Sequence, residues 1–496
     1  MESHSSLPLR RRFGTFSDWA PTLRNRWLAD SAQERKRYEI SVPLSQDALF
    51  GSQNSTLALS APWVEGLTRP ATLARTNMRS IICSRSERDS LCATMTAIPR
   101  YRSYVGPLIL SAGFRPFFLA ASIWATVAIP LWLGAYAEGL TLPTKLAPLI
   151  WHVHEMVFGY AATTVAGFLL TAIPNWTGRM PLQGGPLATL VLLWVIGRFG
   201  VLLSAEIGAP AAAVADLSFP AVFLAVVARE ILAGKNWRNL PMLGALLLLL
   251  LGNLLVHLEA LDLGNTAELG NRLGLVTLLM LISLVGGRII PSFTRNWLAK
   301  AHPEVLPPVP EARFDLAVVV VTGLALLIWT IAPNASVTPW AALAAGIAVA
   351  LRLSRWRGLH TVPEPLLLIL HIGYAWLALG LLLLALNGIL EIVSPAAALH
   401  ALTVGAIGTM TLAVMTRASL GHTGRPLSAG PATKAIYGLI TLAALLRILT
   451  PLAGDLTEFA LWLAGAAWSC AFGLFAVFYG LVLVRPRVPD EISRPI

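Results

Sequence analysis

The sequence predicts an all-α polytopic membrane protein with twelve transmembrane helices. Of its 496 residues, 56% are hydrophobic and only 13% are charged, and the mean hydropathy is +0.67. This composition excludes an ordinary soluble globular chain. From residue 108 onward, apolar runs of roughly 16–25 residues recur, each long enough to cross a bilayer as a helix. The predicted spans lie near residues 114–136, 150–173, 187–205, 212–231, 239–259, 273–291, 315–333, 337–353, 366–388, 396–416, 432–450 and 459–484.

The charges between the predicted spans alternate, and the alternation predicts the topology. Basic residues follow the even-numbered spans: Arg179, Lys235, Arg238, Arg295, Lys300, Arg355, Arg357 and Arg425. The loops after odd-numbered spans are mainly acidic, with only Lys145 and Arg272 as basic residues. Because Lys and Arg favour the cytoplasmic side, both termini are expected in the cytoplasm. The basic residues therefore orient the chain in the lipid bilayer, and the pI near 10.1 does not indicate a nucleic-acid partner.

Residues 1–94 differ in composition from everything that follows. They are rich in Ser and Arg and have no sustained apolar period. The basic run Arg10-Arg11-Arg12 is not followed by the apolar core of a signal peptide. Two interpretations remain: a disordered N-terminal extension, or an overcalled start codon with Met95 as a natural first residue. In both cases residues 95–496 are the predicted twelve-helix membrane domain.

Two stretches resemble each other at an offset of 246 residues. They are WHVHEMVFGYAATTVAGFLLTAIPNWTGRMPL (151–182) and HALTVGAIGTMTLAVMTRASLGHTGRPL (400–427). The offset places His154 on His400 and one Thr-Gly-Arg motif on the other. A weaker copy, IIPSFTRNWL, ends the sixth span, which carries Asn271 in place of the histidine. The hypothesis is three four-helix repeats. The alternative is a chance match between apolar helices with Thr, Gly and Arg at their ends.

Four of the nine histidines are expected at similar depth near the outer face: His152, His154, His257 and His400. Neutral imidazole is a metal ligand and an axial ligand of haem iron. The repeat favours His154 and His400 as a pair that clamps a haem. His152 lies about 200° around the helix from His154, so it is a candidate for the haem or for copper. His257 is the other copper candidate. A lone histidine at a helix end is more often an interfacial hydrogen-bonding residue, and that interpretation stays open.

A charged residue lies midway along the third predicted span. An unpaired Arg198 would be costly there, so it is expected to face a haem propionate or a carboxylate. Glu155 and Glu259, each near an outer histidine, are candidates to orient an imidazole. Near the cytoplasmic ends, five arginines form a candidate anion-binding rim, although snorkelling explains several of them. These are Arg179, Arg288, Arg295, Arg417 and Arg425.

The rim leaves a second function open, a secondary transporter of a small anionic solute. Twelve spans and internal repeats are common among such transporters. A transporter is expected to be colourless, whereas a haem protein has a Soret band. There is no CxxCH attachment motif, so any haem is expected to be non-covalent haem b. Three cysteines offer no thiolate metal site.

Several ordered motifs resemble the NnrS family, membrane proteins of the bacterial nitric oxide response. They are GFRPFF (113–118), WHVHEMVFGY (151–160), TAIPNWTGR (171–179), NLLVHL (253–258), GGRIIPSFTRNWL (286–298), LHIGYAW (370–376) and the 400–427 stretch. The resemblance covers about residues 105–484. It implies a bacterial inner-membrane protein that contains haem and copper and relieves nitrosative stress. Nitric oxide or iron–nitrosyl species are the implied partners, without nitric oxide reductase activity. Neither catalytic residues nor an electron donor can be assigned from the sequence.

Overall fold

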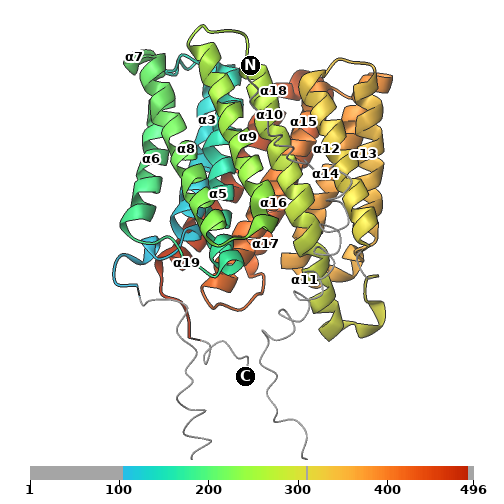
Figure 1. Cartoon of the computed structure of the whole chain (residues 1–496). Helices are drawn as coiled ribbons and strands as arrows, with labels where there is room; N and C mark the ends of the chain where they lie inside the picture. The colour runs from blue at the N-terminus through green and yellow to red at the C-terminus, as the bar shows by residue number, and fades with distance from the viewer. Residues whose placement is uncertain (1–103, 309–310, 490–496) are drawn as a thin grey trace, which may run out of the picture. The chain divides into compact units, whose positions relative to one another are not determined.

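A computed structural model describes residues 104–308 and 311–489, which all belong to one compact unit, Leu91–Ile496. Within these residues the chain forms helices joined by short loops (Figure 1). The predicted extension, residues 1–94, lies outside the described residues. The all-α fold class is therefore confirmed for the part of the chain that the structure describes.

The described residues contain twelve helices that are long and apolar enough to cross a membrane, as predicted. Several spans are built from more than one helical segment. In chain order the α-helices are α3 (Phe114–Ala137), α4 (Pro148–His154), α5 (Ala162–Thr177), α6 (Gly185–Leu202), the short α7 (Ser204–Ile207), α8 (Ala209–Ala233), α9 (Leu240–Ala260), α10 (Ala267–Leu281), α11 (Gly287–Ala301), α12 (Ala312–Ile331), α13 (Val337–Ser354), α14 (Pro365–Leu390), α15 (Pro395–His400), α16 (Thr409–His422), α17 (Pro431–Leu449), α18 (Thr457–Leu474) and α19 (Gly480–Val484).

Four spans contain a π-helical segment. These segments are η3 (Glu155–Ala161), η5 (Ile282–Gly286), η8 (Ala401–Gly408) and η11 (Phe475–Tyr479). A π-helical turn holds an extra residue, so it changes the direction in which the following side chains point, and it is frequent at functional sites. The first residues of η3 and η8 are separated by the predicted offset of 246 residues. This coincidence agrees with the similarity of the second and tenth spans, and the three-unit repeat stays a prediction.

Glycine ends the second and tenth spans in the same way. Gly178 follows α5 and Gly424 follows α16, and both have φ of 70°, a left-handed conformation that favours glycine. In the sixth span the corresponding residue is Arg295. Because no glycine interrupts that segment, α11 continues to Ala301, ten residues beyond the end of the predicted span at 291. The three span ends therefore share sequence without sharing a turn.

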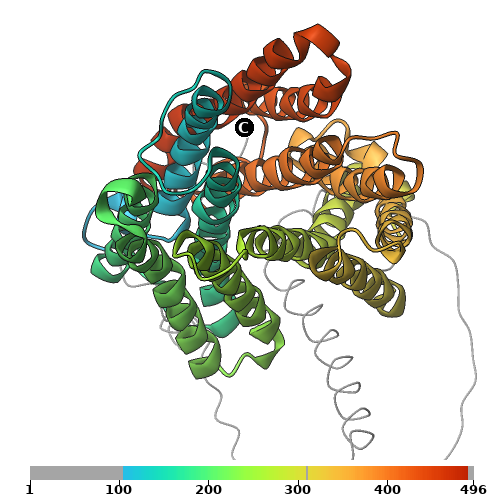
Figure 2. The same ribbon diagram turned by 90° about the horizontal axis from the view of Figure 1, so that it is seen from above.

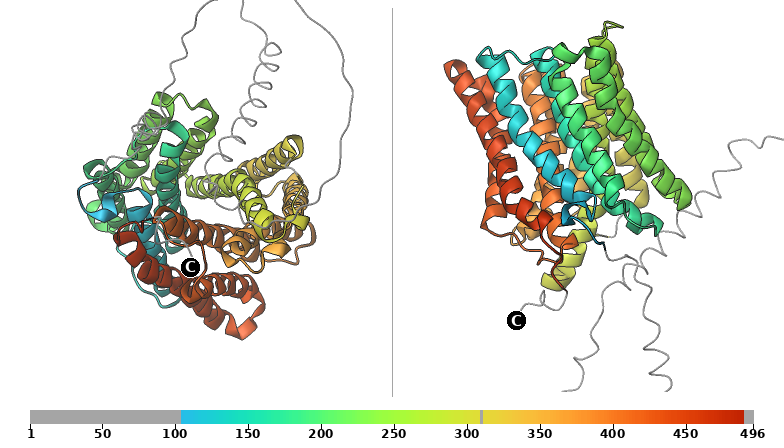
Figure 3. Two further views of the ribbon diagram at one scale, coloured as in Figure 1. Left: turned by 90° about the horizontal axis from the view of Figure 1, so that it is seen from below. Right: turned by 90° about the vertical axis from the view of Figure 1, so that its left-hand side faces the viewer.

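Helices that are adjacent in sequence pack against each other, and α18 packs against α3. The last span of the chain therefore lies beside the first, which Figures 2 and 3 show as red helices next to blue ones. Large apolar side chains such as Leu192, Phe199 and Leu324 are exposed on the helices, as expected where lipid replaces water. Buried polar side chains are consequently the informative ones, because lipid cannot satisfy them.

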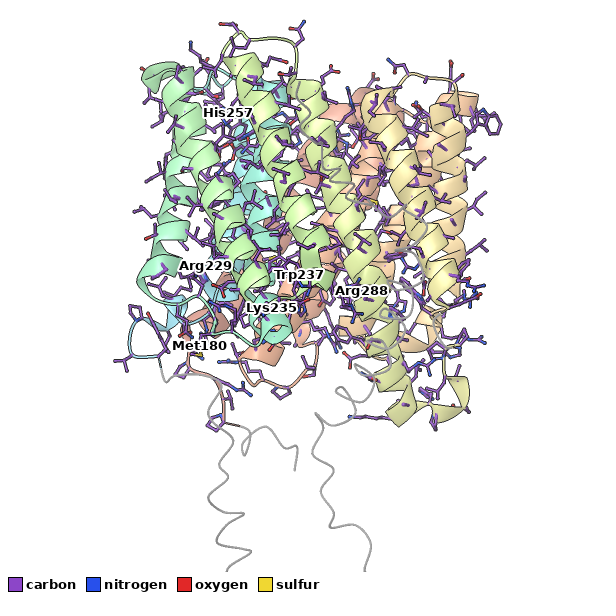
Figure 4. All side chains as sticks on the ribbon, in the orientation of Figure 1. Met180, Arg229, Lys235, Trp237, His257 and Arg288 are labelled. Atoms are coloured by element: carbon purple, nitrogen blue, oxygen red, sulfur yellow. The ribbon has the colours of Figure 1, made fainter. Side chains whose placement is uncertain are left out.

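The two ends of the bundle carry different residues. Figure 4 shows His257 near one end of the helices and Arg229, Lys235 and Trp237 near the other. We call these the histidine end and the basic end. The histidine end also contains the start of the second and tenth spans, where α4 and α15 lead into their π-helical segments.

Candidate functional site

A cluster of six buried polar side chains lies at the histidine end, between the second, third, fourth and fifth spans. We call it the carboxylate cluster. Its members are His154, Glu155, Arg198, Asp216, Asn253 and His257, each at most 3% exposed. Four different spans contribute to it, so no short sequence motif contains the site.

His154 lies at the centre of the carboxylate cluster. Its Nδ1 is 2.9 Å from Glu155 Oε1, and its Nε2 is 2.8 Å from Asn253 Oδ1 and 3.1 Å from Asp216 Oδ2. The Nδ2 atom of Asn253 donates to Asp216 Oδ2 at 2.8 Å, which directs the amide oxygen toward the imidazole. Both ring nitrogens of His154 therefore face oxygen acceptors. Without a bound cation, both must carry hydrogen for these contacts to be favourable.

Asp216 connects the cluster through both of its carboxylate oxygens. Oδ2 is 3.0 Å from His257 Nε2, in addition to its contacts with His154 and Asn253. Oδ1 accepts a short hydrogen bond from Arg198, which also donates to Glu155 Oε2 at 2.5 Å. Arg198 thus bridges the two carboxylates. The sequence predicted either a haem propionate or a carboxylate as its partner, and in the structure the partners are carboxylates.

Gly159, within the π-helical segment η3, leaves the space in which Glu155 and Arg198 meet. Trp124 Nε1 also donates to Glu155 Oε2, at 2.8 Å, and Gly159 lies directly beneath the three groups. A Cβ atom at position 159 would lie 2.6 Å from Glu155 Oε2 and 2.8 Å from the Arg198 guanidinium. Gly159 is therefore required for the close approach of this network to the helix backbone.

The charges of the cluster do not balance. Glu155 and Asp216 contribute two negative charges, whereas Arg198 contributes one positive charge. Burying an uncompensated charge within a membrane is expensive. The cluster therefore favours one further positive charge beside Asp216, carried either by a histidine or by a bound cation.

Three side chains of the cluster form a plausible set of metal ligands. One ligand atom each from His154, Asp216 and His257 lie within 4.8 Å of one another, and all three residues are buried. At metal–ligand bonds of about 2.0–2.1 Å, neighbouring ligand atoms in a tetrahedral site are roughly 3.3 Å apart. The separations of 3.0 and 3.1 Å between Asp216 Oδ2 and the two imidazole nitrogens are close to that value. A metal ion would fit here after small side-chain movements.

The residues that contact these three ligands also suit a metal site. Metal-bound histidines usually donate their other N–H to a carboxylate, which fixes the ring. Glu155 Oε1 occupies that position for His154. Two imidazoles and a carboxylate favour copper, zinc or iron over calcium or magnesium. Beside His257, a small cavity of about 10 Å³ is lined by His257, Ala209 and Ala212 among others, which is just enough for one water molecule.

A second polar group, which we call the histidine pair, consists of His152 and His400. Each is within electrostatic range of the other and of Arg447 on α17. His152 stacks on Trp132, with ring centroids 4.0 Å apart. His400 Nδ1 donates to the Ala396 carbonyl at 2.7 Å, which leaves Nε2 as its metal-binding nitrogen. His152 Nδ1 and Trp132 Nε1 are buried and have no hydrogen-bond partner within the described residues.

The structure groups the candidate histidines differently from the sequence analysis. His154 was paired with His400 through the repeat, but its ring contacts Asp216, Asn253 and Glu155. His400 has His152 as its histidine neighbour instead. The helical geometry explains the change, because residues two apart on α4 point in different directions. His257 joins His154, so the copper candidate and the first haem candidate lie in one cluster.

Two residues of the carboxylate cluster, Asp216 and Asn253, are not among the candidates that the sequence patterns predict. Asp216 is a carboxylate inside an apolar span, and such a residue is a functional candidate by default, so a signal was present. Asn253 stood within the NLLVHL motif without being assigned a role. Glu155 contacts His154, as its position in the sequence suggests, whereas no hydrogen bond joins Glu259 to a histidine ring within the described residues. Its Oε2 accepts a hydrogen bond from the Ala267 N–H at 2.7 Å and thereby stabilises the loop before α10.

Four of the five candidate rim arginines have separate partners among the described residues. Arg179 pairs with Glu230 at 2.5 Å, Arg295 donates to the Pro307 carbonyl at 2.6 Å, and Arg417 lies over the Phe293 ring. Arg425 contacts the Thr423 carbonyl at 3.5 Å, and Arg288 also makes contacts. His371 makes the bundle-interior hydrogen bonds expected of it, to the Leu367 carbonyl and Thr294. The shared anion site at the basic end stays a prediction.

Comparison with known proteins identifies the family. No curated protein matches the sequence. The family model described as NnrS protein matches residues 108–487, which is most of the chain and includes all twelve spans up to Val484. Both polar groups at the histidine end lie inside the matched region. This protein therefore belongs to the NnrS family, and at the level of that family it is a multi-pass membrane protein of the nitric oxide response.

Proposed function

We propose that this protein protects bacteria against nitric oxide, or responds to it, as a haem- and copper-containing protein of the inner membrane. Family membership supports the nitric oxide response. The alternating loop charges support an orientation with both termini in the cytoplasm and the histidine end outside. Nitric oxide or an iron–nitrosyl species would be the partner, and the electron donor is not assigned.

The observation that carries this proposal is the convergence of His154, Asp216 and His257 in a buried site. We assign copper to these three ligands, because the family implies copper and the donors suit it. Glu155 would hold the His154 ring in place, and Arg198 would hold both carboxylates. The cluster also needs one more positive charge, which a copper ion supplies.

We assign haem b to the histidine pair. The orphaned Nδ1 of His152 and the accessible Nε2 of His400 are nitrogen donors that the protein itself does not use. Neither histidine forms an ion pair with a carboxylate within the described residues, so a neutral imidazole is available to iron. With no CxxCH motif, the haem would be held without covalent bonds. When bound, haem iron and copper would provide sites for ligand binding and electron transfer.

The surroundings of the carboxylate cluster suit a small apolar gas as ligand. Residues of four spans bury the carboxylate cluster, so bulk water is excluded while nitric oxide can arrive through the lipid. The rigid network of Arg198, Glu155 and Asp216 holds the ligands without reorganisation. We infer protection or sensing rather than nitric oxide reduction, and any redox reaction would need an external electron donor.

The first experiment is an absorption spectrum of the purified protein, oxidised and dithionite-reduced, with metal analysis of the same sample. A b-type spectrum that shifts on addition of nitric oxide, together with about one copper per chain, is expected. A colourless, metal-free protein that stays so after haem and copper supplementation would contradict the proposal. Such a result would favour the anion transporter, which anion uptake into vesicles would then test.

Alanine variants separate the two assignments. We expect His257→Ala to remove copper and keep haem, and His400→Ala to remove haem and keep copper. His154→Ala should behave like His257→Ala. His371→Ala is the matched control, because His371 is a buried histidine of the same bundle outside both groups. Loss of both cofactors in every variant, including the control, would show a folding defect instead.

A further inference from the structure

The second and tenth spans carry corresponding histidines, and each histidine has an arginine beside it on the next span. His154 is connected to Arg198 of α6 through Glu155 and Asp216, and His400 lies within electrostatic range of Arg447 of α17. The two histidines are 246 residues apart and the two arginines 249. The difference of three residues is less than one helical turn. The histidine end therefore contains two related His–Arg arrangements.

The two arginines differ in their counter-ions. Arg198 forms ion pairs with Glu155 and Asp216. At the offset of 246 residues, those carboxylates are replaced by Ala401 and Trp462. Correspondingly, Arg447 forms no ion pair with a carboxylate within the residues that the structure describes. Arg447 is half-buried in the last turn of α17, and a partly buried guanidinium without a counter-ion favours an anion, so the second arrangement lacks the anion that the first one contains.

The surroundings of Arg447 contain further unused donors. Trp132 Nε1 and His152 Nδ1 belong to stacked rings 4.0 Å apart, and both atoms are buried without a partner. The hydroxyl-bearing ring of Tyr136 also stacks on Trp132, with ring centroids 5.2 Å apart, and lies within electrostatic range of Arg447. Unpaired buried polar atoms in a folded protein usually indicate a ligand or water. The Trp132 ring stacks on His152, which interacts electrostatically with Arg447, so its unused N–H belongs to the same group as an arginine without a counter-ion, a combination that suits an oxygen anion.

We propose that Arg447, with Trp132 Nε1, forms a binding site for an oxyanion or carboxylate at the histidine end, next to the His152 ring. Two sources share this chemistry: a propionate of a haem held by the histidine pair, and a free small oxyanion such as nitrite. The first source rests on the proposed function, whereas the second does not. Arg447 thus takes the role of propionate partner that the sequence analysis gave to Arg198, because Arg198 already holds two carboxylates of the protein.

The first test uses the full-length protein in detergent, depleted of haem, and titrates it with haemin and with haemin dimethyl ester, which lacks the propionate charges. Wild type should bind haemin about 10- to 100-fold more tightly than the ester, the range for charge-assisted hydrogen bonds. Arg447→Leu should lose this preference, and Arg447→Lys should keep part of it. Arg272→Leu is the control, because Arg272 is an arginine of the same end that already pairs with Glu268. Equal binding of haemin and ester by wild type, or a preference unchanged in Arg447→Leu, would overturn the propionate assignment.

The second test titrates the haem-free protein with sodium nitrite by calorimetry. Binding by wild type and Arg272→Leu, with at least a tenfold loss in Arg447→Leu, would support the anion site even if the protein takes up no haem. That pattern would separate a failure of the haem proposal from a failure of the anion site. If the protein shows neither nitrite binding nor a preference for haemin over its ester, the site does not exist. Monodisperse elution of each variant from size-exclusion chromatography shows that the fold is intact.

Discussion

His154 and His257 face each other across a single carboxylate oxygen, Oδ2 of Asp216, at 3.1 and 3.0 Å. They belong to the second and fifth spans, and their rings are nearly perpendicular, at 79°. A cation would stabilise this arrangement directly, because the two imidazoles and the Asp216 carboxylate can each offer a lone pair to the same ion. The predictions below follow from this arrangement and from the backbone that holds it.

Replacing Asp216 by asparagine should remove copper and destabilise the fold. The substitution preserves shape but eliminates a ligand charge and one of the two ion pairs of Arg198. Disrupting a buried ion pair costs roughly 3–5 kcal/mol. Metal analysis and thermal unfolding in detergent measure the two effects. Asp315→Asn is the matched control, because Asp315 pairs with the buried Arg352 at 2.8 Å, away from the carboxylate cluster. It should lower stability while copper is retained. Copper retention in Asp216→Asn would refute the ligand assignment.

Replacing Glu155 by glutamine should weaken copper binding without abolishing it. Glu155 is expected to hold the Nδ1–H of His154 and to accept from Arg198 and Trp124. Loss of such an orienting carboxylate typically reduces metal affinity about 10- to 100-fold. Competition with a copper chelator measures the affinity. Glu259→Gln is the control, since Glu259 stabilises a loop near His257 without contacting either ring. An unchanged affinity in Glu155→Gln would exclude the orienting role.

Replacing Gly159 by alanine should disturb the carboxylate cluster. The added methyl group would lie 2.6 Å from Glu155 Oε2 and 2.9 Å from Trp124 Nε1, so the network must move. Overpacking of this kind costs roughly 1–3 kcal/mol. Gly438→Ala is the control: this glycine is in the exposed part of α17, and nothing lies within 4 Å of an added Cβ. Gly438→Ala should be neutral or stabilise the helix by up to ~1 kcal/mol. Equal melting temperatures for the two variants would contradict the role of Gly159.

The two glycines with a left-handed backbone conformation, Gly178 and Gly424, should differ in how much stability is lost when each is replaced by alanine. At Gly178, with φ of 70°, an added Cβ meets nothing within 4 Å, so only the backbone conformation opposes it, by about 1 kcal/mol. At Gly424, with the same φ, the Cβ would also collide with the Val488 carbonyl at 2.4 Å. Gly424→Ala should therefore lower the melting temperature more than Gly178→Ala. Equal effects, or the reverse order, would contradict this prediction and indicate that the C-terminal segment around Val488 moves aside without cost.

Sequence patterns did not predict which polar residues contact each other in the folded protein. The repeat identified His154 and His400 as corresponding residues, but corresponding residues need not touch. The repeat stays a prediction, and the two histidines have different neighbours. Arg198 was expected to face a haem propionate or a carboxylate, and it pairs with two carboxylates, Glu155 and Asp216. Spacing along the sequence alone could not have chosen these two acidic residues. Asp216 is 62 residues from His154, and Asn253 is 99 residues from it.

The sequence by itself determined the class of the protein and its twelve spans, because a bilayer admits only helices whose apolar length matches its thickness. It also determined the family, through several long motifs that occur in order along this chain. Only the tertiary structure decided which polar residues share a site. That choice depends on how each helix is rotated about its axis, and π-helical segments such as Glu155–Ala161 change the rotation midway along a span. No periodicity in an almost uniformly apolar helix records this rotation, so His152 and His154 could be placed at one depth but not assigned to their separate partners.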